Sequence, residues 1–79
     1  MTKSDLYNQI ASLASHIEFD YNGKSGLIDP INKDEIHLAY NTYSDDVIEK
    51  ALSLPEVMQE PLFDGKCLND ICEDIEFSW

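Results

Sequence analysis

The chain has 79 residues, of which 16 are Asp or Glu and 5 are basic, so its formal net charge is −11 with both histidines neutral. All five basic residues are lysine, whereas a surface that grips nucleic-acid phosphates or anionic lipid needs clustered Lys and Arg. The charge therefore excludes direct nucleic-acid binding and membrane docking. Hydrophobic residues make up 43% of the chain, which is enough for a folded core, and the length predicts a single small domain over residues 1–79.

The start of the chain has the pattern of an amphipathic helix. Apolar residues recur at spacings of four, three and four, at Leu6, Ile10, Leu13 and Ile17. Thr2, followed three residues later by Asp5, resembles a capping box, and the acid also suits the positive end of the helix dipole. These features predict a helix from about Lys3 to His16.

From Glu18 the apolar period changes to two, which is typical of a half-buried strand. The step Asn22-Gly23 follows at once and is a strong signal for a β-hairpin. A second strand is expected over about 25–29, closed by the proline that comes next. A third run, 35–41, again alternates apolar and polar residues. Together these runs predict an antiparallel three-stranded meander.

A short helix is predicted after the third strand. Ser44 is a suitable N-cap, and acids occupy the next two positions, where the helix dipole favours them. The apolar residues of this segment have helical spacing, at Val47, Ile48, Ala51 and Leu52. Pro55 is expected to end the helix because its ring clashes with the preceding turn, and residues 56–60 have room for one further helical turn before the next proline.

A last amphipathic helix is predicted near the C-terminus. Phe63 is expected to be a buried anchor, and Asp64-Gly65 a turn. From about Cys67 the apolar pattern is helical, at Leu68, Ile71, Cys72 and Ile75. The predicted order is thus α-β-β-β-α-α, with two to three short C-terminal helices, in an α+β fold whose helices cover one face of the sheet.

The two cysteines, Cys67 and Cys72, are expected to be free thiols. Five residues along a helix turn about 500°, which directs the two side chains about 140° apart and prevents a disulfide. A zinc site that joins them to His16 and His37 is rejected, because the cysteine spacing is not that of a short zinc knuckle. Free thiols, with no apolar run that suits a signal peptide or a membrane span, predict a cytoplasmic protein.

Catalysis is not expected from this sequence. Nucleophilic catalysis needs a base beside the nucleophile and donors for the developing oxyanion, and the residue spacing indicates no such set. The sequence therefore predicts no enzyme, no catalytic residue, no metal and no cofactor. The alternative from a different class is a thiol- or metal-dependent activity centred on Cys67, because a helix N-terminus can activate a thiol.

The carboxylates of the predicted last helix are the most informative charges. Asp70, Glu73 and Asp74 are three and four positions apart, so they share one helix face with no lysine at those spacings. Such like charges destabilise a helix, and two interpretations of them stay open: a merely solvated face of an acidic protein, and a docking surface for a basic protein partner. The predicted partner-binding residues are Asp70, Glu73, Asp74, Glu76, Asp45, Asp46, Glu49 and Trp79.

The stretch Pro61-Leu62-Phe63-Asp64-Gly65-Lys66-Cys67-Leu68-Asn69-Asp70-Ile71 resembles the C-terminal signature of small, acidic, uncharacterised proteins from low-GC Gram-positive bacteria and their mobile elements. In these proteins a Phe-Asp-Gly-Lys-Ser-Leu-Asn-Glu-Ile-type stretch follows a strand-rich first half. Here Cys67 replaces the usual Ser and Asp70 the usual Glu, and both keep the capping and acidic character. The resemblance covers about eleven residues and implies no activity.

The sequence therefore predicts a non-enzymatic, acidic protein-binding domain that uses a carboxylate-rich helix face. The alternative within binding is an inhibitor or nucleic-acid mimic encoded by a phage or mobile element, because rows of carboxylates on a rigid element can replace backbone phosphates. The sequence sets neither the identity of the basic partner nor the oligomeric state.

Overall fold

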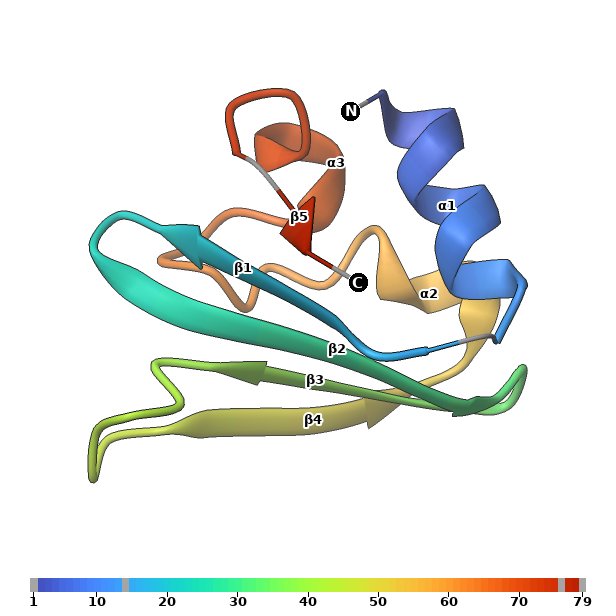
Figure 1. Cartoon of the computed structure of the whole chain (residues 1–79). Helices are drawn as coiled ribbons and strands as arrows, with labels where there is room; N and C mark the ends of the chain where they lie inside the picture. Colours follow the sequence, from blue (N-terminus) through green and yellow to red (C-terminus); the bar gives the residue numbers. More distant parts are fainter. Residues whose placement is uncertain (1, 14, 76, 79) are drawn as a thin grey trace.

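The computed structural model of the chain describes residues 2–13, 15–75 and 77–78. Its elements, in chain order, are α1 (Lys3–Ala11), β1 (Ile17–Tyr21), β2 (Lys24–Asn32), β3 (Glu35–Tyr40), β4 (Ile48–Leu52), α2 (Leu54–Val57), α3 (Leu68–Ile71) and β5 (Phe77–Ser78). The strands form one antiparallel sheet in the order β4-β3-β2-β1-β5, and the helices lie together on one side of it (Figure 1). The predicted α+β class is confirmed.

Helix α1 begins as the sequence predicts and ends five residues early. The Thr2 hydroxyl accepts from the Asp5 backbone N–H (3.1 Å), and the Asp5 carboxylate accepts from the Thr2 N–H (3.4 Å), so the capping box is present. The helix ends at Ala11, and Leu13 has a φ of +55°. This left-handed residue turns the chain, and Ile17, the last residue of the apolar helical pattern, becomes the first residue of β1.

The three predicted strands are present as β1, β2 and β3. Both residues of the Asn22-Gly23 step have positive φ, as the tight turn of a two-residue hairpin requires. Strand β2 is longer than predicted, because it continues through Pro30 to a register shift between Pro30 and Asn32. Pro30 is tolerated there since β1 ends its pairing with β2 at Ile28, so that stretch has a neighbour on one side only.

The helix predicted after β3 is wrong, because this segment forms strand β4 and makes a fourth long strand where a three-stranded meander was expected. Its pairing with β3 runs from Ile36 opposite Leu52 to Tyr40 opposite Ile48. The Ser44 hydroxyl accepts from the N–H of Asp46, two residues on, which is a local turn and not a helix cap. Of the four apolar residues with helical spacing only Leu52 is buried, so the core does not cover the apolar stripe that the spacing suggested.

The last helix is also shorter than predicted, since α3 ends at Ile71 and Cys72 to Asp74 continue only as turns. Its buried residues are nevertheless the expected ones. Leu68, Ile71 and Cys72 join side chains from α1, α2 and strands β1 to β4 in one core. Phe63 is fully buried in this core and forms edge-to-face contacts with Phe19 and Tyr40, at centroid distances of 5.4 and 5.2 Å, so the predicted anchor is confirmed.

Candidate docking surface

Strands β1 to β4 have one side facing the helices and one side facing solvent, which we call the open face. Cross-strand partners point to the same side of an antiparallel sheet, so the register assigns each residue to a side. The core residues Ile17, Ile28 and Leu38 lie on the helix side, and so do their cross-strand partners. The open face consists of Glu18, Asp20, Ser25, Leu27, Asp29, Glu35, His37, Ala39, Glu49 and Ala51.

Within the described strands, the open face carries five carboxylates and no lysine. Lys24 and Lys50 are the two lysines of these strands, and the register places both on the helix side. There each lysine pairs with a carboxylate, Asp64 and Glu60, at 2.8 Å. The one other basic side chain that these strands place on the open face is His37, whose Nε2 lies 2.9 Å from Glu35. This side of the sheet is strongly negative.

An apolar strip lies between the carboxylates of the open face. Glu18 pairs with Leu27, Leu27 with Ala39, and Ala39 with Glu49, so these four residues form one row across four strands. Three strand-to-strand spacings separate Glu18 from Glu49, so their Cα atoms are about 14 Å apart. The row thus has an acid at each end and, in the middle, the half-buried Leu27 and Ala39, which is 8% exposed.

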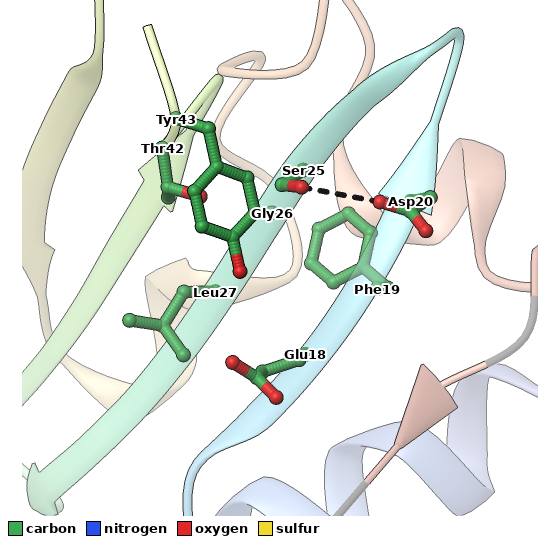
Figure 2. A pocket seen from close by; sticks show the side chains of 8 residues that line it. All are labelled: Glu18, Phe19, Asp20, Ser25, Gly26, Leu27, Thr42 and Tyr43. Atoms are coloured by element: carbon green, nitrogen blue, oxygen red, sulfur yellow. Dashed lines mark hydrogen bonds between the residues drawn. The ribbon is translucent and has the colours of Figure 1, made fainter.

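Two depressions mark the open face. One, of about 710 Å³, lies around Leu27 and the exposed Tyr43. In Figure 2 the Tyr43 hydroxyl points toward the space between Leu27 and Glu18. The other, of about 320 Å³, also borders Leu27 and extends to His37 and Glu49. A partner that covers the sheet can therefore contact an aromatic ring, an aliphatic strip and several carboxylates at once.

The predicted helix-face acids do not form the row that the sequence suggested. The Asp70 carboxylate is engaged in hydrogen bonds at the start of α3. Its Oδ2 accepts from the Cys67 backbone N–H and from the Cys67 thiol, both at 3.1 Å. These hydrogen bonds hold the pKa of Asp70 below its ordinary value. Glu73 and Asp74 are exposed, but they follow the end of α3 and lie in turns. Glu76 and Trp79 lie outside the described residues.

The second predicted acidic group lies beside the open face. Asp45 and Asp46 are exposed in the turn that leads into β4, and Glu49 is an end residue of the cross-strand row. The sequence predicts a helix over all three, where the structure has a turn and strand β4. Glu18, Asp20, Asp29 and Glu35 are not among the partner-binding residues that the sequence predicts. The alternation of acids and apolar residues in the strands was visible, but which side the helices would cover was not.

Cys67 is the N-cap residue of α3. Its sulfur donates to Asp70 at the N-terminus of α3, which confirms the expected position near the N-cap. Both cysteines are free, and burial raises the pKa of Cys72. Among the described residues no group of three or more His, Cys, Asp or Glu side chains is placed to hold a metal ion. Within the same ranges, no helix is both long and apolar enough to cross a membrane.

Asp64, which the sequence predicts only as part of a turn, is the centre of a polar cluster. Asp64 and Gly65 both have positive φ, and Phe63 and Lys66 close this turn with two backbone hydrogen bonds. The Asp64 carboxylate accepts from Asn22 Nδ2 (2.9 Å), Lys24 Nζ (2.8 Å) and the Tyr40 hydroxyl (2.9 Å). The cluster ties the turn after Phe63 to the first hairpin.

The hydrogen bonds from Asn22, Lys24 and Tyr40 lower the pKa of Asp64 to about 2. A carboxylate with a depressed pKa stabilises the fold above its unfolded pKa, and this contribution is lost as the pH falls from about 4 through 2. We expect the urea midpoint of the wild type to exceed that of Asp64→Asn at pH 6, and the two midpoints to converge near pH 2. Asparagine tolerates positive φ, so the turn itself is kept. A difference that does not change with pH would contradict this assignment.

Comparison of the chain with protein-family models, with curated proteins and with solved structures gives no match. The resemblance at Pro61 to Ile71 therefore stays a prediction. In structural terms this stretch contains the buried Phe63, the Asp64-Gly65 turn and the capped start of α3, which are features of the fold.

Proposed function

We propose that this protein is a non-enzymatic, cytoplasmic binding domain whose open face docks a basic protein partner. The observation that carries the proposal is the distribution of charge. Five carboxylates lie on one side of a rigid sheet, while the two lysines of the same strands are paired on the other side. A surface of one sign attracts a partner of the opposite sign and accelerates its association.

The apolar strip supports a docking surface over a merely solvated one. Leu27 is only partly buried, and Tyr43 is 89% exposed beside it. An aromatic and an aliphatic side chain surrounded by charges is the usual composition of an interface, in which apolar contacts supply affinity and a charged rim supplies orientation. The docking residues that we propose are Glu18, Leu27, Asp29, Tyr43 and Glu49.

The proposal is tested by charge reversal on two surfaces. We expect Glu18→Lys with Glu49→Lys to lower the amount of partner retained from native lysate at least about tenfold, because both ends of the row become repulsive. The matched control is Glu73→Lys with Asp74→Lys, which changes the net charge equally at the acids favoured by the sequence. It should leave retention within about twofold of the wild type.

The salt dependence of retention and the comparison of the two variants complete this test. Retention by the wild type should fall with added salt, since exposed charges are screened. Equal retention by the wild type and the Glu18, Glu49 variant would refute docking on the open face. Loss only in the Glu73, Asp74 variant would assign binding to the C-terminal acids instead.

A further inference from the structure

Strand β4 leaves one edge of the sheet without a neighbour in the described part of the chain. The order β4-β3-β2-β1-β5 makes β4 an outer strand, and its pairing is with β3 alone (Figure 1). The outward N–H and C=O groups of such a strand are a template for another strand. This edge is five residues long, from Ile48 to Leu52, which is the usual length of a strand in a sheet.

Exposed apolar side chains are concentrated at the start of this edge. Three of the six large hydrophobic residues that are exposed in the described ranges lie between positions 43 and 48: Tyr43, Val47 and Ile48. Ile48 is 47% exposed although it is part of the sheet, and only Leu52 of β4 is buried. Exposed apolar groups grouped at an edge are typical of a surface that is covered in a complex.

The charges around the edge favour a basic occupant. Asp45, Asp46 and Glu49 belong to the same exposed segment, and the nearby Lys50 is paired with Glu60 at 2.8 Å. A second copy of this chain would bring a net charge of −11 against an equal charge, and its own edge would present the same acids. A positively charged segment from another protein is complementary to the acids at this edge, whereas a second copy of the chain is repelled by them.

We propose that the partner docks by adding an extended segment to the free edge of β4, with basic and apolar side chains in alternation. This inference rests on the proposed function and specifies its geometry. Along β4, Glu49 points to the open face and Ile48 to the opposite side. A strand paired with β4 places alternate side chains on the same two sides, so its basic residues meet Glu49 and its apolar residues meet Ile48.

The probe for this geometry is an acetylated, amidated hexapeptide of alternating arginine and valine. We expect it to bind the wild type and to slow amide hydrogen exchange at Glu49 and Ala51. Binding should weaken at least about tenfold in Ile48→Lys, which adds charge at the edge, and less than about twofold in Ile31→Lys. Ile31 is a matched control because it is 52% exposed and belongs to β2, with β3 between it and the edge.

A second peptide separates strand pairing from charge attraction. N-methylation at alternate residues removes the backbone donors that pair with β4 and keeps every side chain, so this peptide should not bind. Equal binding of both peptides, or no binding of the unmodified one up to roughly 1 mM, would overturn edge pairing. Either result leaves the capture test of Glu18→Lys with Glu49→Lys intact. A homodimer that Ile48→Lys abolishes would assign the edge to a second copy and would also overturn the inference.

Discussion

Replacement of Phe63 by alanine should remove a large part of the stability of the fold. The ring is fully buried and packs edge-to-face against Phe19 and Tyr40. Removing such a ring costs about 3–5 kcal/mol, through lost burial and the cavity that remains. A chain of this size has a total stability of about 4–12 kcal/mol, so one substitution removes a large part of it.

The Phe63→Ala effect is measured as the midpoint of urea denaturation followed by circular dichroism. Phe63→Leu is the control, because a smaller apolar residue keeps most of the burial and should recover most of the lost stability. Phe77→Ala should cost less, since Phe77 is only partly buried against the core. A midpoint for Phe63→Ala equal to that of the wild type would show that the segment from Leu62 to Lys66 does not anchor the fold.

Features that depend on neighbouring residues could be predicted from the sequence. The Thr2 and Asp5 capping box, the Asn22-Gly23 turn and the Asp64-Gly65 turn each follow from the conformations that two to four adjacent residues prefer. The same holds for Cys67 at the start of α3. In each case the local signal and the final structure agree because nothing distant competes with it.

Strand β4 could not be predicted in this way, because its conformation depends on a distant partner. Ser44, followed by acids and by apolar residues at helical spacing, satisfies the local rules for a helix. The outer edge of β3 offers five residue pairs instead, from Ile36 to Tyr40, and the segment pairs with this edge as a strand in place of forming the helix. The β-branched pair Val47 and Ile48 was the one local signal in favour of a strand.

The candidate surface was missed for the same reason. Asp70, Glu73 and Asp74 are close in sequence, so the predicted helix aligns them, whereas α3 ends at Ile71. Glu18 and Glu49 are 31 positions apart and share a cross-strand row only because β2 and β3 lie between them. Periodicity along one strand shows that residues alternate between two sides. It does not show which residues of other strands share each side.

Gly26 should be intolerant of even a methyl group, and the reason is Phe19. The two residues are direct cross-strand partners, and a Cβ built on Gly26 would fall far inside contact distance of the Phe19 ring. The ring cannot simply move aside, because Phe63 and Phe77 pack against it at centroid distances of 5.4 and 5.3 Å. Overpacking of this kind costs about 1–3 kcal/mol. We therefore expect Gly26→Ala to lower the free energy of unfolding, measured by urea denaturation.

A double mutant shows whether the Phe19 ring causes this loss. Phe19→Leu removes the obstructing atoms, so the cost of Gly26→Ala should shrink in that background, and the two changes should not be additive. Gly23→Ala is the contrasting control. Gly23 has open space around its would-be Cβ but a φ of +78°, so its cost is about 1–2 kcal/mol of backbone strain, which Phe19→Leu cannot relieve. If Gly26→Ala costs the same with either residue at position 19, the clash is not what requires glycine there.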